Sequence, residues 1–287
     1  MNTSYSYRGS MQRLETVLKF LKEKGKRVNG TRVEDYQKIV TRFLNKPELT
    51  DDEAWALVEL HELYVIIHGA KKNERIDEGL QRCLRGVRFL EQEQVANSGN
   101  APRNASFELF VASKMAIFGS TLSIPPFGKS ADITFSCAGQ MVPIECKRLY
   151  ATGKVSKILQ ETCSQVSKRL DDGKYGIAAI SLTREFWSSI SSSVMGSADE
   201  ARQAVEELYQ RWRSETFRIL MAYPKVALIY IHIQIPCMGE EQVFYVYERG
   251  FFRTRVNYEN LPEAPIVNEF TEMLTSDGVM NAIARQW

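Results

Sequence analysis

Two apolar segments between residues 131 and 147 carry charged side chains that can do chemistry together. Residues 131–135 contain one aspartate, Asp132, and residues 142–147 contain Glu145 and Lys147, with a turn-like stretch at 136–140 between them. Because side chains alternate between the two faces of a strand, Glu145 and Lys147 share one face. A tight hairpin brings Asp132 across from them. This grouping suits a divalent cation, which prefers oxygen ligands, beside a lysine that holds or polarises an attacking water.

The context of the Glu145 triplet favours a functional site. Glu145 and Lys147 interrupt an otherwise apolar strand, and buried charges are costly unless they are paired or bound to an ion. The alternative is an ordinary edge strand whose Glu–Lys face meets solvent. A second acid-x-Lys triplet, Asp172-Gly173-Lys174, lies in a glycine-containing turn without apolar neighbours, and we interpret it as a solvated loop.

The pattern resembles that of the PD-(D/E)XK superfamily of nucleases, whose fold is called restriction-endonuclease-like. In that family an Asp is followed, after a variable gap, by Glu-x-Lys on the next strand. Here twelve residues separate Asp132 from Glu145-Cys146-Lys147. The proline that precedes the aspartate in the family is Ala131 in this chain, a position that shapes the turn and does no chemistry. The resemblance covers about residues 101–190 and says nothing about residues 1–95.

The resemblance implies a metal-dependent site. Asp132 and Glu145 would bind Mg²⁺, for which Mn²⁺ can substitute, and Lys147 would orient or deprotonate the attacking water or stabilise charge in the transition state.

The resemblance also points to two further candidates, because family members often carry another acid in a preceding helix and a glutamine in the following one. Glu108 is the candidate acid, as a further metal ligand, with a surface helix position as the alternative. Gln165 is preferred over Gln160 as the glutamine near the scissile phosphate, although the sequence barely separates the two.

Basic residues after the triplet are candidates for nucleic-acid binding. Arg148 follows it directly, at the edge of the site, and is the first predicted phosphate contact. Lys154, Lys157, Lys168 and Arg169 follow on the next predicted helix and can grip a nucleic-acid backbone. The alternative for these four residues is a solvated helix face.

The elements that position these residues predict an α/β fold with a restriction-endonuclease-like mixed central sheet flanked by helices. Apolar spacing of three and four indicates a helical N-terminal domain at 1–96, with the capping-box pattern Thr50-Asp51-Asp52-Glu53 at one helix start. Residues 97–104, which are polar and contain glycine and proline, are the predicted linker. The nuclease-like domain is expected at 105–287. Its predicted elements are a helix at 105–118, strands at 122–124, 132–135 and 142–147, a helix at 154–170, a strand at 176–182, a helix at 197–221, strands at 226–235 and 242–247, and a helix from about 265.

Composition narrows the setting of the protein. Among the 287 residues there is no run of eighteen apolar residues and no apolar leader at the N-terminus, so we expect no membrane segment. Five cysteines without metal-site spacing favour a reducing cytoplasm over a disulfide framework. Residues 1–46 hold eleven Lys or Arg against four acids, which is typical either of a phosphate-facing surface or of a solvated helix face.

These observations favour a metal-dependent nuclease, most simply a DNA endonuclease of restriction, repair or phage-defence type acting on double-stranded DNA. A homodimer would supply the two sites that a double-strand cut requires, and the N-terminal helices can bind DNA or a partner protein. The first alternative is a non-catalytic nuclease-fold subunit that binds nucleic acid or serves assembly. The second is a helical interaction protein whose C-terminal part merely folds as α/β.

Overall fold

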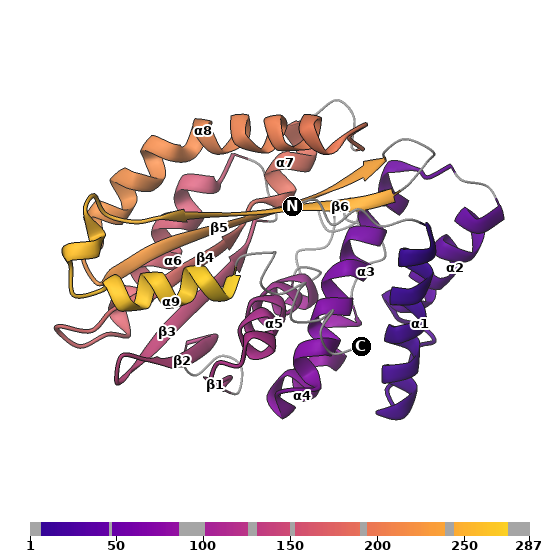
Figure 1. Ribbon diagram of the computed structural model, residues 1–287, viewed down its shortest axis with the longest axis horizontal. Coiled ribbons are helices and arrows are strands. Elements are labelled where there is room, and N and C mark those ends of the chain that lie inside the picture. The colour runs from indigo at the N-terminus through magenta and orange to yellow at the C-terminus, as the bar shows by residue number, and fades with distance from the viewer. Residues whose placement is uncertain are drawn as a thin grey trace.

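The computed structural model describes residues 7–45, 48–85, 101–125, 131–149, 153–189, 194–238 and 244–274, which form a mixed sheet flanked by helices (Figure 1). The strands lie side by side in chain order, with β3, β4 and β5 parallel and the other neighbours antiparallel. The predicted α/β class with a mixed central sheet is therefore confirmed. The strands are β1 (Leu122–Ser123), β2 (Ile133–Cys137), β3 (Gln140–Arg148), β4 (Gly176–Ser181), β5 (Val226–Met238) and β6 (Phe244–Arg253).

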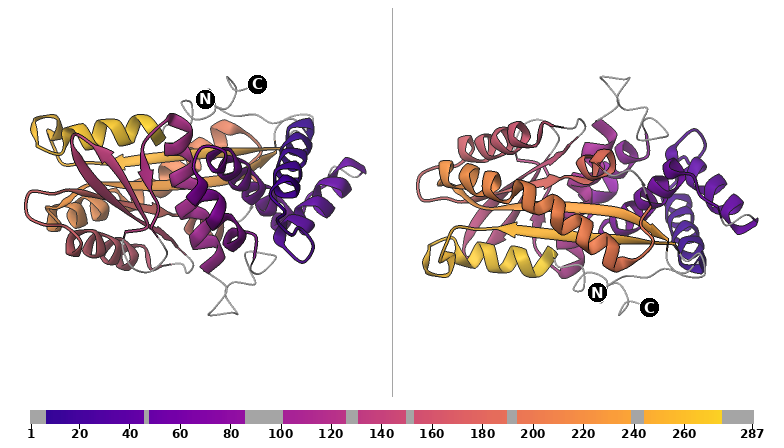
Figure 2. Two further views of the ribbon diagram at one scale, coloured as in Figure 1. Left: turned by 90° about the horizontal axis from the view of Figure 1, so that it is seen from below. Right: turned by 90° about the horizontal axis from the view of Figure 1, so that it is seen from above.

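Helices cover both faces of this sheet. Helices α6 and α8 pack on one face, and α5 and α9 pack on the other (Figure 2). No helix within the described residues is both long and apolar enough to span a lipid bilayer. The helices are α1 (Tyr7–Glu23), α2 (Arg32–Asn45), α3 (Asp51–Ala70), α4 (Glu74–Cys83), α5 (Ala101–Phe118), α6 (Val155–Lys168), α7 (Thr183–Ser189), α8 (Ala198–Ala222) and α9 (Ala264–Leu274).

The described residues before 86 are helical, as predicted. Helix α3 begins with the predicted capping box: the Thr50 side chain accepts from the Glu53 N–H, and the Glu53 carboxylate accepts from the Thr50 N–H at 2.8 Å. Helix α3 is buried nearly all round because it packs on α1 and α4 and also on α5 and β5. The predicted domain division at 97–104 stays a prediction. Buried contacts nevertheless join the N-terminal helices directly to the sheet.

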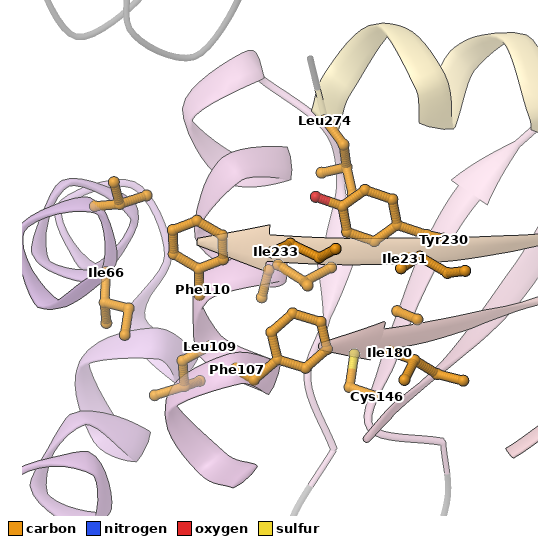
Figure 3. Close-up of a cluster of buried hydrophobic side chains, with 14 of the residues drawn as sticks. Ile66, Phe107, Leu109, Phe110, Cys146, Ile180, Tyr230, Ile231, Ile233 and Leu274 are labelled. Atoms are coloured by element: carbon orange, nitrogen blue, oxygen red, sulfur yellow. The ribbon is translucent and has the colours of Figure 1, made fainter. Parts of the chain in front are cut away.

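Parallel strands β4 and β5 lie inside the sheet, away from its edges, and are buried on both faces, which explains their apolar sequences. Side chains of β3, β4 and β5 pack against α5, where Phe107 and Phe110 lie over the sheet (Figure 3). Cys146 of β3 belongs to this cluster. The core thus fixes β3 against both β4 and α5.

Several boundaries differ from the predicted ones. Helix α5 begins at Ala101, inside the predicted linker, because Pro102 occupies a first helical turn, where no N–H is needed. Strand β6 continues to Arg253, beyond the predicted end at 247, and the short helix α7 was not predicted. Of the fourth predicted helix at 73–96, α4 covers Glu74–Cys83, and residues 86–96 lie outside the described residues.

Candidate active site

The β2–β3 hairpin brings Asp132 beside Glu145. The two strands pair through Ile133 and Ile144, so the next position along each strand is Asp132 on one side and Glu145 on the other. The Cys146 N–H donates a hydrogen bond to Asp132 Oδ2 at 2.8 Å. This bond fixes the aspartate on the edge of β3 where the β2 pairing ends. Asp132 and Glu145 therefore lie across the hairpin from each other, as predicted.

Strand alternation places Glu145 and Lys147 on the sheet face opposite Cys146. Cys146 points into the core near Phe107 (Figure 3), so its neighbours on the strand face α6. Glu145 is fully buried, and Lys147 is partly exposed. The site therefore combines a deeply placed carboxylate with a lysine at the border of solvent.

Glu108 completes a group of three carboxylates. It lies on α5, on the other side of the β3 edge, and burial raises the pKa of its carboxyl to about 8, with the charges of Asp132 and Glu145 adding to the effect. Burial and the charge of Asp132 likewise raise the pKa of Glu145 to about 7. The pKa of Asp132 is raised by burial, with the Cys146 N–H and Lys147 opposing that shift. Asp132 thus acts on Glu145, and both act on Glu108, so a nearby positive charge would stabilise the ionised forms of these carboxylates.

Arg169 supplies a positive charge beside Glu145. Its Nη1 atom lies 2.6 Å from Glu145 Oε1, in an orientation that makes an ion pair without hydrogen-bond geometry. Neither oxygen of Glu145 has a hydrogen-bond partner within the described residues, and the same holds for Glu108 Oε2. Arg169 follows the last residue of α6, and its side chain is 35% exposed against 1% for Glu145. The guanidinium thus reaches from the surface to the buried carboxylate.

The two candidate glutamines on α6 differ in their exposure to solvent. Gln160 is exposed, whereas Gln165 is partly buried and its Oε1 atom is buried without a hydrogen-bond partner in the described part of the chain. Gln165 also precedes Arg169 by four residues, a spacing that places both on one face of a helix. This arrangement favours Gln165 as the glutamine that faces the site.

The predicted phosphate contact at Arg148 needs correction. Alternation turns Arg148 to the face opposite Glu145, where it is 7% exposed and donates to both oxygens of Glu62, at 3.1 and 3.0 Å. It also donates to the Arg103 carbonyl at 3.4 Å. Arg148 is therefore an internal cation that joins β3 to α3. The predicted contacts Lys154, Lys157 and Lys168 are exposed at α6, where Lys157 Nζ lies 3.7 Å from Glu161.

In this structure the three carboxylates are not arranged as the ligands of one metal ion. Within the described residues, no three His, Cys, Asp or Glu side chains already surround one point as metal ligands. Asp132 is held by a backbone N–H and Glu145 by Arg169, so the three carboxylates can close around an ion only after their side chains turn. What the sequence analysis missed is the contact between Arg169 and Glu145. Its one local signal is the four-residue spacing from Gln165.

Comparison of this chain with protein-family models, with curated proteins and with solved structures found no significant match. The assignment of the site therefore rests on the residues and their geometry.

Proposed function

We propose that this protein is a metal-dependent nuclease of the PD-(D/E)XK type that hydrolyses phosphodiester bonds, with double-stranded DNA as the preferred substrate. One observation carries the proposal: Asp132 lies across the β2–β3 hairpin from Glu145, on the strand that also carries Lys147, and the charges of Asp132 and Glu145 both reach Glu108 and help to raise its pKa. Along the chain, Glu108 lies on α5, Asp132 immediately before β2 and Glu145 on β3. This succession of a helix and two strands is the order expected for that family.

The donor set fits a hard divalent cation. Carboxylate oxygens are its preferred ligands, and within the described residues neither oxygen of Glu145 nor Glu108 Oε2 accepts a hydrogen bond, although Arg169 forms an ion pair with Glu145. Asp132 and Glu145, with Glu108 as a further ligand, would hold Mg²⁺, or Mn²⁺ in its place. When bound, the cation would neutralise phosphate charge and favour ionisation of water.

The remaining chemistry belongs to side chains of this protein. The Lys147 ammonium can donate hydrogen bonds to the attacking water and to a phosphate oxygen, since it borders solvent on the same strand face as Glu145. The Cys146 N–H keeps one oxygen of Asp132 in place, which leaves Oδ1 for a ligand. Gln165 can orient a water or phosphate oxygen through its amide.

A non-catalytic, nuclease-fold binding or assembly subunit is the second candidate function. Two observations favour it: Arg169 already pairs with Glu145, and no three side chains of the described residues surround one point as metal ligands. A titration of the protein with Mn²⁺, followed by the electron paramagnetic resonance signal of free Mn²⁺, discriminates between the two. The nuclease should bind Mn²⁺, and Glu145→Gln should remove that binding.

The activity itself is tested by incubating the protein with supercoiled plasmid, linear duplex, single-stranded DNA and RNA. Each substrate is combined with Mg²⁺, Mn²⁺ or EDTA. Cleavage of duplex DNA with either cation and none with EDTA is the expected result. If all four substrates stay intact with both cations, while Mn²⁺ remains unbound, the nuclease proposal is wrong.

Homodimerisation belongs to the same proposal, because cutting both strands of a duplex with one site per chain calls for two chains. Light scattering of the free protein and of its DNA complex tests this point. A strict monomer in both states would contradict it.

A further inference from the structure

Arg169 contacts the candidate site on one side and an open groove on the other. The groove has a volume of about 500 Å³ and lies beside the β2–β3 hairpin. Its lining includes Thr134 and Met141 from the hairpin and Arg169 and Lys174 from the segment after α6. Asp171 also lines it, so the groove carries two cations and one carboxylate. Arg169 is the residue that both lines this groove and pairs with Glu145.

The charges around Glu145 explain why a cation is held there. Glu145 is fully buried, and a buried carboxylate without a counter-charge is costly. Lys147, on the same strand face, also acts on Glu145, but Arg169 forms the direct contact. A divalent cation that uses Glu145 as a ligand must therefore compete with the guanidinium for the same oxygens.

Displacement of Arg169 would leave its guanidinium at the groove. The side chain begins just beyond the end of α6 and is one third exposed, so it can turn outward without disturbing the helix. A guanidinium offers several N–H donors in a planar fork that matches the oxygens of a phosphate. In the groove it would lie beside Lys174, where a phosphodiester is the matching anion.

We propose that Arg169 exchanges partners: it neutralises Glu145 while no divalent cation is bound, and it binds a phosphate of the substrate backbone once a cation has taken its place. This inference rests on the proposed nuclease function. It assigns to Arg169 a substrate-binding role that depends on cation binding.

The first test measures the affinity of Mn²⁺ alone for the full-length protein and for Arg169→Gln at pH 8. Removal of the competing guanidinium should tighten Mn²⁺ binding by at least about tenfold, since the ion pair no longer has to be broken. Lys168→Gln is the matched control, because it removes one positive charge from the neighbouring exposed position. Its Mn²⁺ affinity should stay within about twofold of the wild-type value, as expected for a screened surface charge.

The second test measures the affinity of a fluorescent DNA duplex by anisotropy, with Ca²⁺ or with EDTA. Arg169→Gln should weaken binding with Ca²⁺ and lower the salt dependence by about one phosphate contact. With EDTA the same substitution should have no effect, because the guanidinium is then paired with Glu145. An equal loss in both conditions would identify Arg169 as an ordinary surface contact and overturn the partner exchange.

The outcomes separate this inference from the proposed function. If the wild-type protein binds Mn²⁺ and Arg169→Gln binds it equally or more weakly, competition by Arg169 is wrong and the nuclease proposal stands. If neither protein binds Mn²⁺, both proposals fail. Thermal melting checks that the variants fold. Should Arg169→Gln not fold, Arg169→Lys keeps the competing charge but loses the planar fork, so it should bind Mn²⁺ about as the wild type does and bind the duplex more weakly with Ca²⁺; an unchanged duplex affinity would overturn the phosphate contact.

Discussion

The guanidinium of Arg148 donates to both carboxylate oxygens of Glu62, which joins β3 to α3 across 86 residues of sequence. Both side chains are buried, at 7% and 2% exposure. Because Arg148 follows Lys147 on the strand, this anchor on one face helps to hold Lys147 toward the other. The structural role of α3 thus extends to the geometry of the candidate site.

Loss of the Glu62 carboxylate should destabilise the fold strongly. Glu62→Ala removes the carboxylate that accepts both of these Arg148 hydrogen bonds, and breaking a buried pair in this way costs about 3–5 kcal/mol. Urea unfolding followed by circular dichroism measures the change. Asp199→Ala is the control, since it breaks the exposed Arg202–Asp199 pair and should have little effect. Equal stabilities of Glu62→Ala and the wild-type protein would show that Arg148 has found another partner.

Glu145→Gln should abolish most of the cleavage activity while preserving the fold. The amide keeps the shape of the side chain and removes the charge that a divalent cation requires. The rate should fall by at least ~10²-fold, or roughly 3 kcal/mol in the barrier, which is typical for one essential electrostatic element. The melting temperature should be unchanged or higher, because burial already disfavours the charged carboxylate and raises its pKa to about 7.

Asp172→Asn provides the internal control for that experiment. Asp172 belongs to the look-alike triplet, is exposed, and pairs with Lys225 at 2.9 Å on the surface. Its substitution should leave the cleavage rate as it is. Full nuclease activity in carefully purified Glu145→Gln protein would defeat the site assignment.

Lys147→Ala should separate catalysis from binding. The substitution removes the ammonium that orients the attacking water, so cleavage of a duplex should be lost. Duplex affinity in the presence of Ca²⁺ should stay within a few-fold, since one phosphate contact among several contributes little to affinity. A parallel loss of affinity and rate would assign Lys147 to substrate binding.

The central part of the site could be predicted because its determinants are local. The side-chain period of two and the short turn at 136–140 decide that Asp132 and Glu145 meet, and both can be read from neighbouring residues. The capping box at Thr50 was predictable for the same reason. Face assignment by alternation also applied to Arg148, which lies on the face opposite Glu145. The prediction that Arg148 contacts a phosphate at the edge of the site did not take this alternation into account.

The remaining features depend on how distant elements pack. The Arg169–Glu145 contact requires α6 to lie against β3, and the Arg148–Glu62 pair requires α3 to lie against α5. Strand β6 continues beyond the predicted end at 247 and passes through Gly250. In the fold this glycine lets the Tyr230 ring approach, since a Cβ there would lie 2.7 Å from a ring carbon.

The carboxylate of Glu59 should give the fold a measurable dependence on acid. It pairs with Arg32 at 2.8 Å and with Arg103, and it accepts from the Tyr36 hydroxyl at 2.7 Å. Burial alone would raise the pKa of Glu59, but the charges of Arg103 and Arg32 outweigh it and lower the pKa to about 2. A depressed carboxyl pKa stabilises the folded state above the unfolded value, near 4.5, and the contribution is lost as the pH falls toward 2.

This shift corresponds to about 3 kcal/mol at neutral pH, of which about 2 kcal/mol should disappear between pH 5 and pH 3. Glu59→Gln cannot titrate, and it removes the negative charge that pairs with both Arg32 and Arg103. The variant should therefore be less stable than the wild type at pH 7, and the difference between the two proteins should shrink as the pH falls. Urea unfolding of both at pH 7, 5 and 3 measures that difference, in which the titration of all other carboxyls cancels. A difference that stays constant over this range would show that Glu59 is not the ionised partner of the two arginines.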